Sequence, residues 1–264
     1  MTTLPISFAK FASKQFLRNK DFSFTSSQAM AGLVAREFPK AALAFPIAFV
    51  KAAESFSPIA VLGLKPGKNL LVDRDGRWLA TYIPAEFRGF PFSLAKAADG
   101  RQLLCIDDAH GSVSETEGES IFGDNGQITP AVKEILDFLS QVALNRETTL
   151  KLMTILQKYQ LFTPWQIQVQ IPNHEAYNVD GLFRVDEGAL RELGADALKE
   201  LQESGVLLLI YCQLLSMQHL STLQKLAVSC EISEKTELSS QKESSAHGVS
   251  FAVDNTTISY ENVS

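Results

Sequence analysis

Short apolar runs bounded by proline, glycine and polar residues dominate the first half of the chain. Runs of this kind, without strict alternation, are typical of strands buried on both faces. They predict strands at residues 46–50, 58–64, 69–73, 77–82, 91–95 and 102–107. The last four are predicted to form two hairpins, because Asp75-Gly76 and Asp99-Gly100 lie between them and glycine accepts the positive φ of a tight turn. Short helical segments are predicted at residues 39–46 and 83–88.

After Thr129-Pro130, apolar side chains recur at helical spacing. Threonine followed by proline is a common helix start, and helices stop before proline. The pattern therefore predicts a long helix from residue 130 to before Pro164, and it leaves open a break near Asn145. Strands at residues 165–171 and 181–186 follow, then helices at 197–203 and 206–226. The last helix is apolar over much of its surface and is predicted to lie in the core.

These elements define an α+β fold in which a sheet-rich N-terminal half, with mixed or antiparallel strands, packs against a helical C-terminal half. A polar segment at residues 108–127 lies between the halves and is predicted to be an exposed, mobile loop. The length of 264 residues and the hydrophobic content of 45% suit one core. We predict a globular domain at residues 1–230 and a flexible tail at 231–264, which is too polar to fold alone.

The net negative charge of the chain makes some classes of binding partner unfavourable. A net charge of −6 and a pI near 5.3 oppose binding to nucleic acid or to anionic lipid. Three cysteines without a CxxC pair indicate a reducing compartment. The first residues lack the apolar stretch of a secretory signal, and the most apolar run, residues 206–212, is too short to span a bilayer. The sequence thus predicts a cytoplasmic protein without membrane insertion, with non-classical export left open.

Three segments resemble metal or phosphate motifs, and each lacks a required residue. Residues 73–76 resemble the start of a calcium loop, but Pro84 stands where a glutamate should close it. Residues 63–69 resemble a phosphate-binding loop that is one residue short and contains Pro66. After His174-Glu175, Asn178 stands where a zinc-binding helix needs its second histidine. No cofactor and no metal ion are predicted.

One group of charged and aromatic residues is a candidate pocket: Trp78 and Tyr82 are followed by Arg88. On a structural interpretation, the two rings pack on the sheet and the guanidinium pairs with an acid such as Glu37 or Asp107. On a functional interpretation, the guanidinium binds a carboxylate or phosphate over an aromatic floor. Both interpretations remain open.

A second group consists of Asp180, Arg184 and Asp186. Its structural interpretation is that Asp186 caps the next helix while Arg184 bridges the two acids. Its functional interpretation is that these three residues contribute to a ligand pocket together with the first group. The candidate pocket residues are Glu37, Trp78, Tyr82, Arg88, Asp107, Asp180, Arg184 and Asp186.

Blocks along most of the chain carry a family resemblance. They include Glu37-Phe38-Pro39-Lys40-Ala41, Asn69-Leu70-Leu71-Val72-Asp73, Gly76-Arg77-Trp78, Tyr82-Ile83-Pro84-Ala85, Asp180-Gly181-Leu182-Phe183-Arg184 and Leu214-Leu215-Ser216-Met217. With these blocks the chain resembles the SapC family from about Val34 to about Leu226. The family takes its name from a gene of a bacterial surface-layer locus, so the resemblance implies a link to the surface layer or cell envelope. It supplies no catalytic residues.

Three hypotheses for the function follow. The first is an accessory or binding protein of envelope or outer-membrane nutrient-uptake systems, with a protein partner or a small peptide-like ligand. The second is an enzyme acting on a peptide or surface polymer through a dispersed site built from Glu37, Arg88, Asp107 and Arg184. The third is a structural surface-layer component. The first is favoured because the sequence contains no complete catalytic motif.

Overall fold

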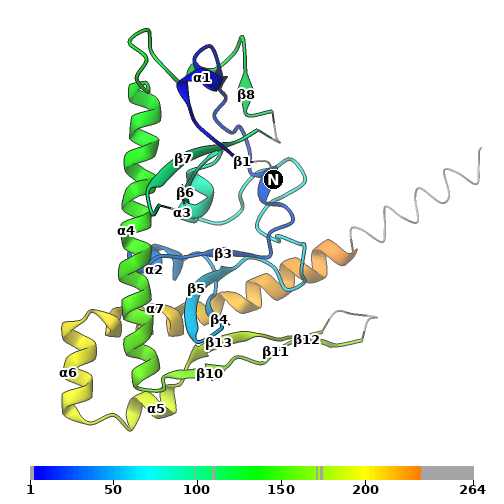
Figure 1. The fold of residues 1–264 in the computed structure, drawn as a ribbon. Coiled ribbons are helices and arrows are strands. Elements are labelled where there is room, and N and C mark those ends of the chain that lie inside the picture. The colour runs from blue at the N-terminus through cyan, green and yellow to red at the C-terminus, as the bar shows by residue number, and fades with distance from the viewer. Residues whose placement is uncertain (1–2, 98, 109–110, 171, 173–174, 233–264) are drawn as a thin grey trace, which may run out of the picture.

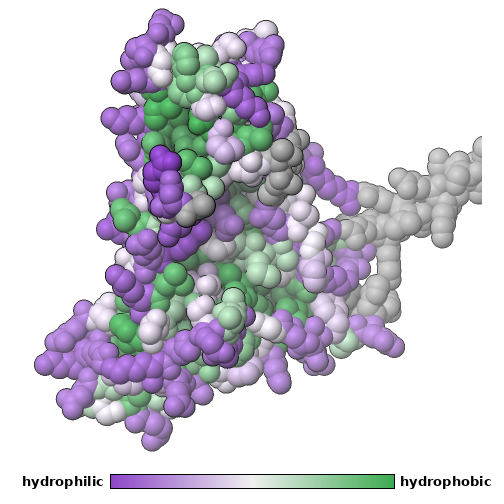
Figure 2. All heavy atoms as spheres, in the orientation of Figure 1, coloured by the Kyte–Doolittle hydropathy of each residue, from purple (hydrophilic) through white to green (hydrophobic). Residues whose placement is uncertain are grey.

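The computed structural model of the chain has an α+β fold, as predicted (Figure 1). It describes residues 3–97, 99–108, 111–170, 172 and 175–232. Hydrophilic residues cover much of the outer edge of the molecule, and hydrophobic ones gather in its upper part and middle (Figure 2). Residues 231 and 232 still belong to the last helix, and the rest of the predicted tail lies outside the described residues.

A five-stranded antiparallel sheet forms the centre of the fold, with the order β10-β13-β4-β5-β3. Its strands are β3 (Met30–Gly32), β4 (Ile47–Ala52), β5 (Ser55–Val61), β10 (Phe162–Pro164) and β13 (Leu182–Val185). Successive residues of β4 point to different hydrophobic clusters, with Phe49 in one and Ala48 in another. Burial on both faces explains why these strands appear in the sequence as continuous apolar runs.

The described residues form three smaller sheets as well. A three-stranded sheet has the order β1-β7-β6, another has the order β8-β2-β9, and β11 pairs with β12. The strands are β1 (Thr3–Pro5), β2 (Gln15–Phe16), β6 (Phe92–Lys96), β7 (Gln102–Asp107), β8 (Val113–Ser114), β9 (Glu119–Ser120), β11 (Ile167–Val169) and β12 (Tyr177–Val179). The predicted loop at 108–127 therefore supplies two short strands, β8 and β9, to the second of these sheets.

One long helix, α4 (Pro130–Lys158), runs along the side of the molecule and contacts both β6 and β5 (Figure 1). It is continuous, so the break left open near Asn145 is absent. The other helices are α1 (Phe8–Phe11), α2 (Phe38–Ala41), α3 (Ala85–Arg88), α5 (Glu187–Arg191), α6 (Ala195–Glu203) and α7 (Val206–Ser216), with 3₁₀ turns η1 (Ser23–Thr25), η2 (Ala35–Glu37) and η3 (Met217–His219). Because α4 packs on two sheets, it joins the upper and lower parts of the molecule.

For the hairpin predicted at residues 69–82, the structure confirms the turn but not two full strands. Gly76 has a φ of 77° and its N–H donates to Asp73, as a tight turn requires. The flanking residues form a single bridge, between Val72 and Trp78. The preceding backbone bonds elsewhere: the N–H of Asn69 donates to Ser26, and that of Leu70 donates to Leu62. Across the turn, the N–H of Asp73 donates to Arg77 and that of Leu79 donates to Leu71, so the local pairing is confined to residues 71–79.

The last helix docks on the central sheet through two buried polar residues. Val185 and Ile47 lie opposite each other, just beyond the last paired residues of β13 and β4. Val185 N–H donates to Gln213 Oε1 (3.0 Å), and Gln213 Nε2 donates to the carbonyl of Ile47 (3.1 Å). Ser216 Oγ accepts from Ile47 N–H (2.9 Å) and donates to the carbonyl of Gln213. The glutamine amide thus takes the place of a missing cross-strand hydrogen bond.

Helix α7 continues through η3 and residues 220–232. The whole segment, Val206–Ile232, is long and apolar enough to cross a membrane, judged by length and composition alone. The helix predicted at residues 206–226 is therefore longer than expected, and its apolar length exceeds the run of seven residues at 206–212. The core helices of soluble proteins pass the same test, and 39% of the most apolar window is buried inside the fold. The hydrogen bonds of Gln213 and Ser216 to β4 and β13 account for the helix as a core element of this fold.

Replacing Gln213 with leucine is expected to lower the free energy of unfolding by about 2 kcal/mol or more, because two buried backbone groups lose their partners. Urea denaturation of the variant measures the change. Gln218→Leu, at an exposed position of the same helical segment, is the matched control and is expected to change stability by less than about 0.5 kcal/mol. Equal effects of the two substitutions would contradict the bridging role.

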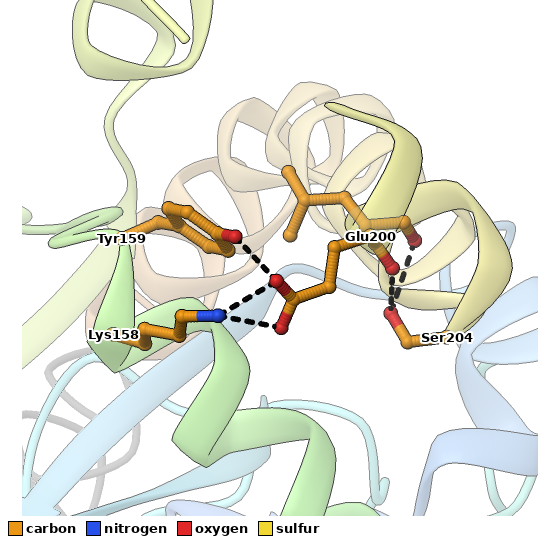
Figure 3. Close-up of polar contacts among 5 residues, drawn as sticks. Lys158, Tyr159, Glu200 and Ser204 are labelled. Carbon is orange, nitrogen blue, oxygen red and sulfur yellow. Dashed lines mark hydrogen bonds and ion pairs between the residues drawn. The ribbon is translucent and has the colours of Figure 1, made fainter. Parts of the chain in front are cut away.

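A carboxylate fastens the end of α4 to α6 (Figure 3). Glu200 accepts hydrogen bonds from Lys158 Nζ (2.6 and 2.8 Å) and from the hydroxyl of Tyr159 (2.5 Å). Ser204 Oγ donates back to the carbonyl of Glu200 (2.7 Å). The bonds from Lys158 and Tyr159 hold the pKa of Glu200 below its ordinary value of 4.5. A carboxylate with a lowered pKa in the folded state stabilises the fold only while it is ionised.

Glu200→Gln is therefore expected to lower the unfolding temperature at neutral pH. The effect should diminish as the pH falls from about 4.5, the ordinary pKa that the unfolded chain keeps, through the lower pKa of the folded state. Thermal unfolding followed by circular dichroism from pH 7 to pH 3 measures this difference. Glu203→Gln removes an exposed pair at 3.8 Å on the same helix and serves as the control. A pH-independent effect of Glu200→Gln would count against the ionic contact.

Candidate ligand-binding cleft

A cleft of about 220 Å³ opens between α4 and the segments around α2 and α3. Its lining comes from three parts of the chain that are far apart in sequence. The lining residues are Val34, Arg36, Glu37, Lys40, Tyr82, Ala85, Arg88, Phe138, Gln141, Val142 and Asn145. The cleft is partly apolar with a few polar groups that converge, which is the usual composition of a small-molecule site.

Glu37 lies at the base of this cleft with only 4% of its surface exposed. Its Oε2 accepts from the N–H of Val34 (3.0 Å), and its Oε1 accepts from the N–H of Ala85 (2.7 Å) and from the hydroxyl of Tyr82 (2.9 Å). Three donors stabilise the carboxylate without a cation in direct contact. Glu37 therefore joins the η2 turn to α3 and fixes the shape of the cleft.

Helix α4 holds the η2 turn in place from the other side. The N–H of Ala35 donates to Thr149 Oγ1 (2.8 Å), and the N–H of Arg36 donates to Asn145 Oδ1 (3.3 Å). The first N–H groups of a helical turn have no partner within the turn, so side chains of α4 satisfy them. Asn145, near which the sequence left open a helix break, lies within the continuous helix, and its side chain makes this contact.

Tyr82 connects the buried carboxylate to the mouth of the cleft. Its hydroxyl donates to Glu37 and accepts from Arg88 Nη2 (3.1 Å). Trp78 supports it from behind, since its indole N–H donates to the carbonyl of Tyr82 (2.8 Å). Burial, together with the charge of Glu37, raises the pKa of Tyr82 well above its usual value of 10 against the opposing effect of Arg88. The hydroxyl therefore stays protonated at neutral pH and acts as a hydrogen-bond donor to Glu37.

Positive charge gathers at the mouth of the cleft. The guanidinium of Arg88 lies 5.0 Å from the ring centre of Phe138 and 5.6 Å from that of Tyr82, within range of cation–π attraction. Arg36 and Lys40 line the same cleft and are exposed. Within the described ranges, none of these three cations forms an ion pair. In a protein with a net charge of −6, this is a local excess of positive charge.

The structure brings part of the first predicted group together. Glu37, Tyr82 and Arg88 line the cleft, and Trp78 lies directly behind Tyr82. Arg88 reaches Glu37 through the tyrosine hydroxyl and does not pair with it directly. Asp107 is buried beside a different cleft, of about 270 Å³, near Pro91 and β1.

The second predicted group lies elsewhere, around β13. Asp186 caps α5, as predicted: its Oδ1 accepts from the N–H groups of Gly188 (2.9 Å) and Ala189 (3.1 Å). Arg184 donates to the carbonyl of Val185, and in the described part of the chain it forms no ion pair with Asp180 or Asp186. The predicted bridge between the two acids is therefore wrong. Since Asp107 and Arg184 do not line the cleft that holds Glu37 and Arg88, these four residues do not form one site.

Sequence reasoning missed the wall of the cleft formed by α4 and the two cations beside Glu37. The wall residues Phe138, Gln141, Val142 and Asn145 recur at helical spacing, so they share one face of α4. Such a face looks the same in sequence whether it lines a core or a pocket. Arg36 and Lys40 flank Glu37 in the chain, and that local clustering was an available signal.

No group of three or more potential metal ligands comes together among the residues that were described. Cys105 and Cys212 are buried thiols without a disulfide bond, and burial raises the pKa of each. A reactive cysteine needs the opposite shift, towards the thiolate. The polar chemistry of the cleft consequently rests on its arginines, lysine, tyrosine and glutamate.

A sequence model of the SapC family matches residues 6–223, so the chain belongs to the SapC family. No curated protein and no solved structure matches the chain. The match starts earlier in the chain than the resemblance inferred from the sequence blocks.

Glu37→Ala is expected to lower the free energy of unfolding by about 2 kcal/mol or more, because the buried N–H groups of Val34 and Ala85 lose their acceptor. Chemical denaturation provides the measurement. Glu54→Ala, in the exposed turn between β4 and β5, is the control and is expected to change stability by less than about 0.5 kcal/mol. Wild-type stability of Glu37→Ala would show that the carboxylate does not hold the cleft together.

Proposed function

We propose that this SapC-family protein is a non-catalytic binding protein that captures the carboxylate of a small peptide-like ligand in the cleft around Arg88. The single observation that carries the proposal is the cluster in one cleft of three cations that form no ion pair with any described residue, in a protein of net negative charge. A ligand carboxylate supplies the charge that the described residues do not. Guanidinium groups recognise carboxylates well because two parallel N–H groups match the two oxygens.

The aromatic surface of the cleft supports ligand binding as well. The rings of Tyr82 and Phe138 flank the Arg88 guanidinium, which limits its freedom before any ligand arrives. Preorganisation of this kind lowers the entropic cost of binding. Gln141 and Asn145 add amide groups along the α4 wall, suited to the peptide groups of a ligand.

The same contacts argue against catalysis in this cleft. Glu37, the carboxylate of the cleft, already accepts three hydrogen bonds, and Tyr82 is held protonated. A neutral tyrosine hydroxyl is not a base, and both oxygens of Glu37 are already engaged in holding the fold together. A binding role uses the geometry as it stands.

We further propose that the protein serves as an accessory to cell-envelope or surface-layer systems and acts from the cytoplasm. The family name supports the link to the envelope, and the buried thiols of Cys105 and Cys212 fit a reducing compartment. A peptide-like ligand suits such a role because the proteins of a surface layer are themselves polypeptides. Native mass spectrometry of freshly purified protein, followed by denaturation, would identify a ligand that copurifies.

Calorimetric titration with trialanine, with a free or an amidated C-terminus, tests the binding mode. The free acid is expected to bind, and Arg88→Ala is expected to weaken its binding about tenfold or more, since a charge-assisted pair is lost. Arg88→Lys should recover only part of the affinity, because lysine cannot form the paired contact. Arg101→Ala, an exposed arginine at the turn after β6, is the control. Equal binding of the acid and the amide, or unchanged affinity of Arg88→Ala, would overturn the proposal.

A further inference from the structure

The helical segment that contains Glu37 carries two cations on one face. Residues 35–41 form one continuous segment, in which the η2 turn runs directly into α2. Arg36 and Lys40 stand four residues apart in this segment, so their side chains leave it on the same face. Both line the cleft around Arg88, and both are exposed. The cleft therefore has a pair of cations on one element in addition to the guanidinium of Arg88 on another.

These two cations have no compensating charge in the free protein. Across the described ranges, neither Arg36 nor Lys40 forms an ion pair. Like charges four residues apart on a helix repel each other and weaken it. An anion bound between the two side chains removes this repulsion, so the face they share favours an anionic group.

The charge of the whole cleft indicates how many anionic groups it takes. Among the residues that line it, Arg36, Lys40 and Arg88 are cations and Glu37 is the one acid, which gives the lining a net charge of +2. One ligand carboxylate bound at Arg88 would leave one positive charge without a partner. A ligand with two carboxylates balances the lining.

The position of Arg88 separates the two anionic groups. Its Nη2 donates to the hydroxyl of Tyr82 (3.1 Å), and its guanidinium lies 5.0 Å from the ring centre of Phe138. These contacts hold Arg88 beside α3 and α4, whereas Arg36 and Lys40 belong to the η2–α2 segment. The volume of about 220 Å³ is below the roughly 300–1,000 Å³ of sites for drug-sized ligands. Both carboxylates must consequently lie on the same small group, such as a single terminal residue.

We propose that Arg36 and Lys40 form a second anion subsite, which selects ligands whose terminal residue carries a side-chain carboxylate, such as a peptide that ends in glutamate. Arg88 binds the terminal carboxylate, and the η2–α2 pair binds the carboxylate of the side chain. This inference rests on the function proposed above and names the class of ligand that the same cleft prefers. Arg36 and Lys40 are then the residues that determine specificity.

Calorimetric titration of the full chain with alanyl-alanyl-glutamate and with alanyl-alanyl-glutamine tests the subsite at low ionic strength. The two peptides share their size and terminal carboxylate and differ in the charge of one side chain. The glutamate peptide is expected to bind about tenfold more tightly, because it gains a charge-assisted contact. In the variant Arg36→Gln/Lys40→Gln this advantage should fall to about twofold or less, whereas Arg88→Ala should weaken the binding of both peptides.

A matched variant controls for the general loss of positive charge. Lys51→Gln/Lys96→Gln removes the same charge from two exposed lysines that do not line the cleft, and it should keep the preference for the glutamate peptide. The Arg36→Gln/Lys40→Gln variant should unfold at a temperature no lower than the wild type without peptide, because it removes a repulsion and no ion pair with a described residue.

The possible outcomes distinguish the subsite from the proposed function. Equal affinity of the wild type for the two peptides, with binding that still depends on Arg88, would overturn the subsite and leave the proposed function standing. A preference that survives in Arg36→Gln/Lys40→Gln would overturn the subsite too. Inorganic phosphate that binds as tightly as the glutamate peptide would show one site for a single dianion, against the two subsites. Absence of binding by both peptides would overturn the proposed function and the subsite together.

Discussion

The fold depends on a buried glutamine of α7 that bridges two neighbouring strands of the central sheet at the point where they stop pairing with each other. Strands β4 and β13 stop pairing before Ile47 and Val185, and the side chain of Gln213 spans the gap between them. An apolar helix could pack on the same surface, but it would leave two backbone groups buried without partners. The glutamine binds the backbone groups that the two strands leave unpaired, and this sets where α7 lies. Because α7 contacts α2, it also sets where the segment around Glu37 lies.

The cleft follows from a second buried polar group. Glu37 collects donors from its own turn, from the backbone at Ala85 and from the ring of Tyr82, so two distant segments are brought to one point. The carboxylate of Glu37 is engaged by these donors and does not pair with Arg36, Lys40 or Arg88. Among the described residues these three cations form no ion pair. Structure and binding are thereby divided between residues: the buried acid shapes the site, and Arg88 faces the solvent.

Sequence patterns were reliable where the partners are local. The hairpin of β4 and β5, the hairpin of β6 and β7 and the start of α4 at Pro130 all follow from nearby residues. The strands expected at 69–73 and 77–82 are reduced to a short pairing around one bridge, because Asn69 and Leu70 bond to distant backbone groups that no local pattern reveals. For the same reason Glu37, Tyr82 and Arg88 could be picked out by residue type, while the α4 wall that completes their cleft could not.

The pairing of distant segments has a consequence for the order in which the chain can fold during synthesis. The hairpins β4–β5 and β6–β7 pair strands that are neighbours in the sequence and can close as soon as they emerge. Strand β1 waits for β7, and Ile47 waits for Gln213, 166 residues further along the chain. A nascent or truncated chain that lacks α7 leaves the backbone groups of Val185 and Ile47 unpaired and uncovers the apolar surface on which the helix packs. Exposed apolar surface of this kind is where unfinished chains associate with one another, so the last helix also protects the sheet from association with other copies of the chain.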